Sequence, residues 1–309
     1  MLRSTALFGS LLVACGGEVA PADGGALLDA AASDAGCTPP PGEPFACEDL
    51  TPDPACGARW VVGVTGRVET TLGAPVDGAR AQLCVRVHPS EVLICLPPPV
   101  ADASGAFAIV VPREARCQSR AAMRAIAPGR GLATTYCPVA LDASAGPLVE
   151  VASPYRLPPV TAAAAPPRGD ADAERDVVFS DGVVLTLVPS ALPSADEYAA
   201  LAGALVDVSA TECFRGALAP DGAYAFDPEA PIRGGAAVSI PNTAGLAAGA
   251  EVDLYVLGGL ETRLLDGAEV EEGELGRFGL GVVSADGAAI VAATDARLPY
   301  LSWLVWRAR

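Results

Sequence analysis

The stretch that decides the fold is Asp181-Gly182-Val183-Val184-Leu185-Thr186-Leu187-Val188-Pro189-Ser190-Ala191-Leu192. Its central run, Val183 to Val188, is short, rich in β-branched side chains and bounded by an Asp-Gly pair and a proline, which is typical of a β-strand. Similar runs occur at Trp60 to Val64, at Ala106 to Val111 and at Val252 to Val256. We therefore expect a chain built mainly from short strands.

Asp-Gly pairs separate many of these runs. Because Gly beside Asp suits the positive φ angles of tight hairpins, turns are predicted at Asp77-Gly78, Asp181-Gly182, Asp221-Gly222, Asp266-Gly267 and Asp286-Gly287. The only helix expected is short, with Ser194 and Glu197 forming a capping box ahead of Tyr198 to Ala204. The predicted fold class is all-β, with two antiparallel β-sandwich domains in series after a signal peptide and a disordered tether.

Composition divides the chain of 309 residues into five parts. Residues 1–15 have the character of an exported leader, and residues 16–57 are rich in Pro, Gly and acidic residues without any basic residue, which predicts a disordered tether. A second Pro-rich break predicts a Pro/Ala-rich linker at 154–176. The two β-sandwiches are accordingly expected at 58–153 and at 177–309.

The N-terminus has one positive charge, Arg3, ahead of a short apolar run that is too short to span a bilayer as a helix. The ending Leu12-Val13-Ala14-Cys15 followed by Gly16 resembles the lipobox of bacterial lipoproteins. The resemblance implies that Cys15 is acylated, that it begins the mature protein and that it anchors the protein to a membrane. Since Asp at the next position favours retention in the inner membrane in that family, Gly16 implies the outer membrane, on its periplasmic face or at the cell surface. An ordinary leader cut after Ala14 or Ala22 remains open.

Within 58–153, three segments resemble the carboxypeptidase regulatory-like (transthyretin-like) module: Gly66-Arg67-Val68, Gly73-Ala74-Pro75-Val76-Asp77-Gly78-Ala79 and Asp102-Ala103-Ser104-Gly105-Ala106-Phe107. The resemblance covers roughly residues 60–136 and implies a seven-stranded sandwich without catalysis, in which Phe107 is a core residue. The chain departs from the family after Phe107, where Pro112 to Arg120 replaces the usual hairpin.

Within 177–309, four short segments are similar to a ZU5-like β-domain: residues 185–192, Phe226-Asp227-Pro228, Val238-Ser239-Ile240-Pro241 and Leu298-Pro299-Tyr300-Leu301-Ser302. The Gly-Gly pair that often opens such domains is replaced by Phe179-Ser180-Asp181-Gly182. No catalytic residue is implied by this resemblance.

Nine cysteines in an exported chain predict disulfide bonds, because a lipidated Cys15 leaves an even number. If His88-Pro89-Ser90-Glu91 is a hairpin loop, Cys84 lies opposite Cys95, so we expect these two to be bonded. Cys117 with Cys137 is the second expected pair. The partners of Cys37, Cys47, Cys56 and Cys213 stay open, and a bridge from the tether to Cys213 would join the two domains.

Several kinds of site are disfavoured by composition. The chain has no Lys and a single histidine, His88, which is expected to lie in a solvated loop. Residues 170–174 imitate the start of a calcium loop but lack its glycine, so a solvated linker is favoured. Residues 276–281 have too many glycines in a strand context for a dinucleotide loop, and a β-bend explains them better.

Tryptophans and charge limit the possible partners. Trp60, Trp303 and Trp306 form a candidate sugar platform, but the odd step between Trp303 and Trp306 places them on opposite faces of a strand, so at least one is expected in the core. Without its leader the chain has 19 basic and 37 acidic residues, so nucleic-acid binding is not expected.

The sequence therefore predicts a non-catalytic lipoprotein of the cell envelope, anchored through Cys15, that acts as a structural or binding module without a cofactor or metal. An envelope protein or a polysaccharide is the expected partner. The alternative is a carbohydrate-binding accessory protein at the cell surface, and a hydrolase that uses two carboxylates is a third hypothesis.

Overall fold

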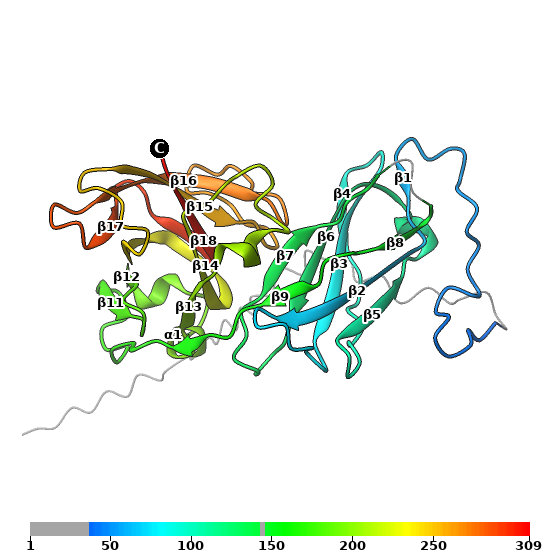
Figure 1. The fold of residues 1–309 in the computed structure, drawn as a ribbon, viewed down its shortest axis with the longest axis horizontal. Coiled ribbons are helices and arrows are strands. Elements are labelled where there is room, and N and C mark those ends of the chain that lie inside the picture. Colours follow the sequence, from blue (N-terminus) through cyan, green and yellow to red (C-terminus); the bar gives the residue numbers. More distant parts are fainter. Residues whose placement is uncertain (1–36, 143–145) are drawn as a thin grey trace, which may run out of the picture.

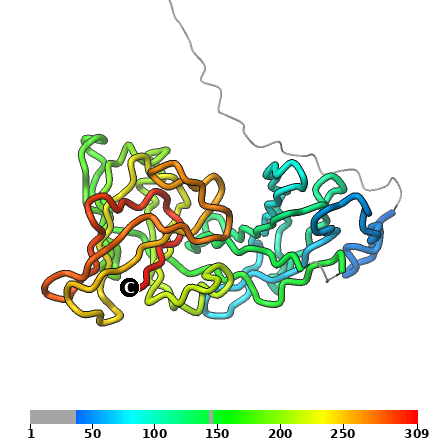
Figure 2. Tube along the Cα trace, turned by 90° about the horizontal axis from the view of Figure 1, so that it is seen from above, coloured from blue at the N-terminus to red at the C-terminus, as the bar shows by residue number. Residues whose placement is uncertain are grey.

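The computed structural model of the chain describes residues 37–142 and 146–309, which are built almost entirely from strands (Figure 1). Two β-sandwich units lie side by side along the long axis of the molecule, and both views show them in contact (Figures 1 and 2). The all-β fold class is therefore confirmed. Cys15, the leader and residues 16–36 of the expected tether lie outside the described residues. Within the described ranges, no helix has the length and apolar character needed to cross a bilayer.

The first unit contains nine strands and one short 3-10 helix. They are β1 (Arg59–Trp60), β2 (Gly63–Thr70), β3 (Arg80–Val87), β4 (Val92–Cys95), β5 (Ala106–Val110), η1 (Arg113–Ala115), β6 (Cys117–Ile126), β7 (Thr135–Pro138), β8 (Leu148–Glu150) and β9 (Tyr155–Leu157). One sheet has the order β1-β6-β3-β4, with β7 also paired to β6, and the other has the order β5-β2-β8, with β9 also paired to β2. The strands of this unit pair antiparallel, except that β8 and β9 run parallel to β2.

The core of the first unit lies between its two sheets. Alternate residues of β2, β3, β5 and β6 point inward, as the period of two along a strand requires. Phe107 on β5 is among the buried residues, as the resemblance to the carboxypeptidase regulatory-like module implies. The turn before it is closed by Asp102, whose side chain accepts a hydrogen bond from the Ser104 backbone N–H at 2.8 Å.

The second unit contains nine strands, one α-helix and two 3-10 helices. They are β10 (Thr161–Ala162), β11 (Arg175–Val178), β12 (Val184–Leu187), η2 (Pro189–Ala191), α1 (Ala195–Ala199), β13 (Ala202–Val206), η3 (Val208–Thr211), β14 (Gly222–Pro241), β15 (Glu251–Leu257), β16 (Leu275–Val283), β17 (Ala289–Ala292) and β18 (Leu298–Ala308). They form one sheet in the order β10-β13-β14-β17-β16-β15-β18, with β11 and β12 attached, and β14 also pairs with β18.

This extra pairing closes the sheet on itself through β14, which is 20 residues long. The first part of β14 pairs with β13 and β18, and its last residues pair with β12 and β17. Register shifts interrupt the pairing with β18, and Gly234 and Gly235 take φ angles of +76° and +70° there. Because Gly adopts these angles without steric cost, the strand bends at this point and its two ends face each other across a core.

The expected linker at 154–176 is wrong in its first part. Tyr155 and Leu157 lie in β9, pair with β2 and are buried in the first core. The chain then enters the second unit at β10, which pairs with β13. The alternation of buried Tyr155 and Leu157 is typical of a strand, although the proline content suggested a spacer.

The expected disorder of the tether is wrong for residues 37–57. Cys37 is bonded to Cys47 and Cys56 to Cys117, so two disulfides hold this segment. Phe45 packs on Gly63 of β2, where a Cβ would lie 2.1 Å from the Phe45 ring atom Cε1. Composition alone missed these tertiary contacts.

Two local expectations also need correction. Ser194 caps α1 as predicted, since its Oγ accepts a hydrogen bond from the Glu197 N–H at 3.1 Å, but the helix ends at Ala199 because Ala202–Val206 is strand β13. Four of the five Asp-Gly pairs have the expected positive φ at Gly, whereas Gly222 begins β14. Gly222 instead leaves room for Trp306, whose Cζ2 would be 2.0 Å from a Cβ at that position.

Candidate functional site

The two units share one apolar core where they meet. Strand β18 sends alternate side chains to opposite faces, so Leu304 and Trp306 fill the core of the second unit while Trp303 and Val305 belong to the core cluster of the first. Trp303 is fully buried, and its Nε1 donates a hydrogen bond to the Thr134 carbonyl at 2.8 Å. The junction is thus packed in the same way as the interior of a domain.

A buried carboxylate, Glu229 on β14, lies at the centre of this junction. Its Oε2 accepts two hydrogen bonds from Arg124 on β6, from Nε at 3.1 Å and from Nη2 at 2.7 Å. Its Oε1 accepts one from the Tyr136 hydroxyl of β7 and one from the Tyr300 hydroxyl of β18 at 2.9 Å. The Tyr136 hydroxyl also accepts from the Leu260 N–H at 3.3 Å. Groups from both units therefore meet at one carboxylate.

The electrostatics of this cluster follow from its burial. Burial is the largest influence on the pKa of Arg124 and would lower it, but the charge of Glu229, its hydrogen bonds to Arg124 and the nearby Tyr136 and Tyr300 together outweigh burial and hold that pKa above its usual value. Burial, together with the Glu229 carboxylate, raises the pKa of both Tyr136 and Tyr300, so both stay protonated donors. Burial and the same carboxylate also raise the pKa of Asp227. The cluster is arranged to hold an ion pair in place.

Around the cluster, a second set of ion pairs joins strands β3 and β6 to the acidic loop at 258–274. Arg86 and Arg120 are cross-strand neighbours, an arrangement of like charges that is unfavourable unless it is compensated. Arg86 pairs with Glu269 at 2.6 Å and with Glu272 at 3.7 Å. Arg120 pairs with Glu271 and, at 3.4 Å, with Glu274. The carboxylates of the loop thus neutralise both arginines.

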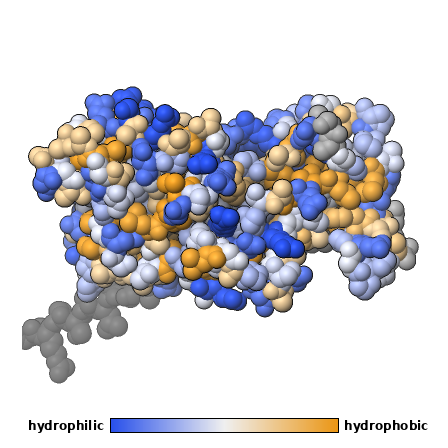
Figure 3. Space-filling view, viewed as in Figure 1, coloured by the Kyte–Doolittle hydropathy of each residue, from blue (hydrophilic) through white to orange (hydrophobic). Residues whose placement is uncertain are grey.

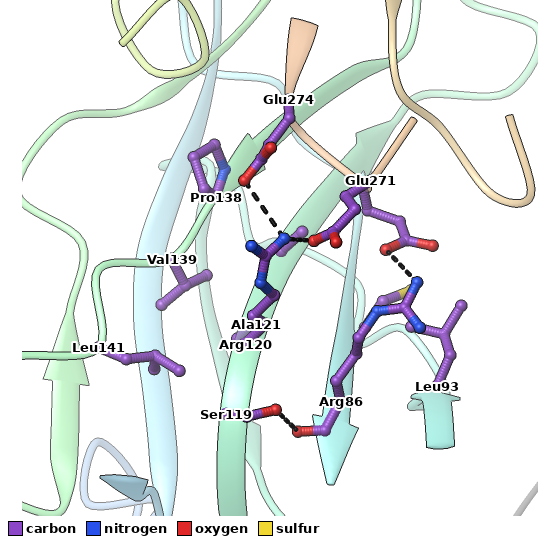
Figure 4. A pocket seen from close by; sticks show the side chains of 13 residues that line it. Arg86, Leu93, Ser119, Arg120, Ala121, Pro138, Val139, Leu141, Glu271 and Glu274 are labelled. Carbon is purple, nitrogen blue, oxygen red and sulfur yellow. Dashed lines mark hydrogen bonds and ion pairs between the residues drawn. The ribbon is translucent and has the colours of Figure 1, made fainter. Parts of the chain in front are cut away.

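A pocket of about 250 Å³ lies at this rim. Figure 4 shows Val139 and Leu141 on one side of Arg120, with Glu271 and Glu274 reaching it from the other. Figure 3 shows hydrophilic side chains where the two units meet and a more apolar area on the first unit. Arg86 and Arg120 in this pocket are already paired with carboxylates of the loop. The charged groups of the pocket therefore hold the two units together.

A disulfide crosses the same junction. Cys137, next to Tyr136 on β7, is bonded to Cys213, which follows η3 of the second unit, with a Cα–Cα distance of 5.3 Å. A covalent bond, a shared core and a buried ion pair therefore act at one interface.

A second hollow lies on the first unit, beside the N-terminal segment 37–57 that two disulfides hold. This groove has a volume of about 620 Å³ and is lined by Gly42 and Pro44 of that segment and by residues of β2, β5 and β8. Arg67, Glu69 and Glu150 also line it. Arg67 acts electrostatically on Asp102, which also lines the groove. Among residues 37–142 and 146–309, no side-chain hydrogen bond or ion pair engages Glu69 or Glu150, so these hydrated carboxylates are accessible to a ligand.

The predicted cysteine sites have different outcomes. Cys84 and Cys95 are bonded, and they are direct partners in the β3–β4 hairpin with Val87 opposite Val92, as predicted. The expected pairing of Cys117 with Cys137 is wrong, since Cys117 is bonded to Cys56 and Cys137 to Cys213. The bridge to Cys213 joins the two units, but it starts from β7 and not from the tether.

The other candidate residues are placed as follows. Trp303 and Trp306 point to opposite faces as predicted, and both are fully buried, so neither can stack on a sugar. His88 lies in the hairpin loop with 37% of its side chain exposed, 3.8 Å from Glu91. Gly276, Gly279 and Gly281 lie in β16, which pairs with β15 through a register shift, in agreement with the expected bend. Over the described ranges, no group of three or more possible metal ligands is found, residues 170–174 included.

Sequence reasoning missed Glu229 and its partners, because nothing local marks a glutamate that becomes buried between two units. One signal was available. Arg120 and Arg124 lie on the same face of a strand, and the run from Glu269 to Glu274 holds four glutamates. A basic sheet face and an acidic loop in one chain are complementary, which could have suggested that they contact each other.

No family model matches the chain, and no curated protein matches it significantly. The resemblances to lipoproteins and to the two β-domain families therefore remain predictions from the quoted motifs.

Proposed function

We propose that the chain is a non-catalytic lipoprotein of the cell envelope, attached to the outer membrane through Cys15, and that it acts as a rigid structural or binding module. The observation that carries the proposal is the junction of the two units. Its shared core around Trp303, the Cys137–Cys213 bond and the Glu229 ion pair all oppose hinge motion. A rigid body of this kind is suited to holding a surface at a defined distance from its anchor.

The disulfides support an exported location. All eight cysteines from Cys37 onward are bonded in pairs, and bonds of this kind persist in oxidising compartments such as the periplasm or the cell surface. The excess of acidic residues favours a soluble, exposed surface and disfavours anionic partners. Two acyl chains or more at Cys15 would give stable membrane attachment.

Metabolic labelling with a fatty-acid analogue tests the anchor. The wild-type chain should incorporate the label and fractionate with the outer membrane, and Cys15→Ala should lose both properties. Cys37→Ala is the matched control, because it removes another cysteine near the N-terminus and should keep the label. Equal labelling of the wild type and Cys15→Ala would contradict the anchor.

The groove beside the N-terminal segment supports the alternative function, a carbohydrate-binding accessory protein. Trp303 and Trp306 are buried, and the groove offers a glycan Arg67, Glu69 and Glu150, whose charged groups can hydrogen-bond sugar hydroxyls. Retention of the purified protein on cell-wall polysaccharide, lost in Arg67→Ala and Glu150→Gln but kept in Glu274→Gln at the junction rim, would favour this alternative. Equal retention of all four proteins would contradict the use of the groove.

A further inference from the structure

The four disulfides do not join cysteines in the order in which they occur along the chain. Cys37–Cys47 and Cys137–Cys213 join neighbours in that order. Cys56–Cys117, in contrast, encloses Cys84–Cys95. If each cysteine were bonded to the next free one as the chain entered an oxidising compartment, Cys56 would pair with Cys84 and Cys95 with Cys117. Two of the four bonds would then be wrong.

The entropy of the unfolded chain also disfavours formation of the Cys56–Cys117 bond before folding. Cys117 is 61 residues from its partner Cys56 but only 20 from Cys137. Since the probability of closing a flexible loop falls with the −3/2 power of its length, Cys117 meets Cys137 about fivefold more often than Cys56 in an unfolded chain. Cys56 is only nine residues from Cys47, which gives that wrong pair an advantage of about 18-fold over the native one.

The native contacts that select Cys56–Cys117 come from folded structure. Arg116, next to Cys117, donates from Nε to the Val111 carbonyl at 2.9 Å and from Nη1 to the Asp49 carbonyl at 3.3 Å, and it forms an ion pair with Glu48. These contacts hold the N-terminal segment against β6 only after the sandwich has formed. Wrong bonds made earlier must therefore be exchanged.

We propose that maturation of this chain requires a thiol–disulfide isomerase in the compartment to which it is exported. The inference rests on the export that is part of the proposed function. The thiolate of the isomerase attacks Cys117 in a Cys95–Cys117 bond, forms a mixed disulfide and releases the Cys95 thiolate. That thiolate attacks Cys84 in the Cys56–Cys84 bond, which forms Cys84–Cys95 and releases the Cys56 thiolate.

The Cys56 thiolate then attacks Cys117 in the mixed disulfide, forms Cys56–Cys117 and expels the isomerase thiolate. Two disulfides enter this sequence and two leave it, so neither an oxidant nor a reductant is consumed. The enzyme is regenerated, and the partner is defined by its chemistry, an accessible thiolate that exchanges with non-native bonds.

The test expresses the full chain in a bacterium that oxidises exported proteins, with and without its periplasmic disulfide isomerase. Because the chain has no Lys, cleavage after Arg places Cys56, Cys84, Cys95 and Cys117 on four separate peptides. Non-reducing mass spectrometry then distinguishes the peptide that ends at Arg59 joined to 117–120, the native bond, from the same peptide joined to 81–86, the wrong one. Cys84 is only 28 residues from Cys56, whereas Cys117 is 61 residues away, so loss of the isomerase should lower the ratio of the native to the wrong Cys56 bond about threefold, the ratio expected from loop closure.

Two variants remove the enclosed arrangement in different ways. Cys56→Ala/Cys117→Ala leaves only bonds between consecutive cysteines and also removes the wrong pairs Cys47–Cys56 and Cys117–Cys137, so it should give native bonds equally in the two strains. Cys84→Ala/Cys95→Ala removes only the enclosed bond, so it should depend less on the isomerase than the wild type. If one fails to fold, the other still tests the inference. Cys37→Ala/Cys47→Ala is the control, because it keeps the enclosed bond and should stay dependent on the isomerase.

Equal native fractions of the wild type in both strains would overturn the inference while the proposed anchor and location still stand. The same holds if Cys84→Ala/Cys95→Ala and Cys56→Ala/Cys117→Ala both depend on the isomerase as strongly as the wild type. Eight free thiols in both strains would overturn the inference and the proposed export together.

Discussion

Replacing Glu229 by Gln would leave Arg124 in the junction without a countercharge. The side chains of Glu229 and Arg124 are only 6% and 23% exposed, so water does little to screen the remaining guanidinium. Removing one partner of such a pair typically costs about 3–5 kcal/mol. Because a Gln carbonyl can still accept from Tyr136 and Tyr300, we expect a loss near the lower limit, about 3 kcal/mol.

Equilibrium unfolding in urea with the disulfides intact measures this loss, and the fluorescence of the buried tryptophans reports it. Arg124→Met and the double variant complete a thermodynamic cycle, in which residues that interact directly show coupling of about 0.5–3 kcal/mol. Glu274→Gln is the control, since its pair with Arg120 is more than half exposed on both sides and exposed pairs contribute at most about 1 kcal/mol. Additive effects of Glu229→Gln and Arg124→Met, or a loss no larger than in the control, would refute the role assigned to this pair.

Four further substitutions test the packing and the electrostatics. Burial and the Glu229 carboxylate raise the pKa of Asp227, so the folded chain binds this proton more tightly than the unfolded chain and stability falls as the pH rises above about 3.8. Asp227→Asn should therefore gain stability relative to the wild type between that pH and neutrality, and a constant difference across a pH series would contradict this. The Tyr155 hydroxyl is buried without a partner, so Tyr155→Phe should change the free energy of unfolding by no more than about 1 kcal/mol, whereas Tyr300→Phe, which loses a bond to a carboxylate, should lower it by about 1–3 kcal/mol in the same urea assay. Gly222→Ala should lower it by about 1–3 kcal/mol through its clash with Trp306, and a melting temperature equal to that of the wild type would contradict this.

The parts of the fold that were predicted correctly depend on local rules. The register of the β3–β4 hairpin follows from its four-residue loop, which places Cys84 opposite Cys95. The opposite orientation of Trp303 and Trp306 follows from the period of two along a strand. In each case the residues that decide the outcome lie within a few positions of one another.

The incorrect expectations depend on contacts between distant segments. Composition suggested that residues 37–57 were a free tether, but the Cys56–Cys117 bond and Phe45 attach them to the first sheet. Proline content suggested a linker where β9 completes the first core. The position of Glu229 depends on how two complete units meet, which no spacing along the sequence encodes.

Contacts between segments that are distant in the sequence also decide whether the two units can be treated as independent domains. The face of β18 that carries Trp303 and Val305 is buried only because the first unit covers it. Without the first unit this face would expose apolar surface, and Glu229 would lose Arg124 and Tyr136. Separation therefore costs the second unit both hydrophobic burial and a paired charge. The two sandwiches therefore have separate strand topologies, but they share a packed core and a paired charge.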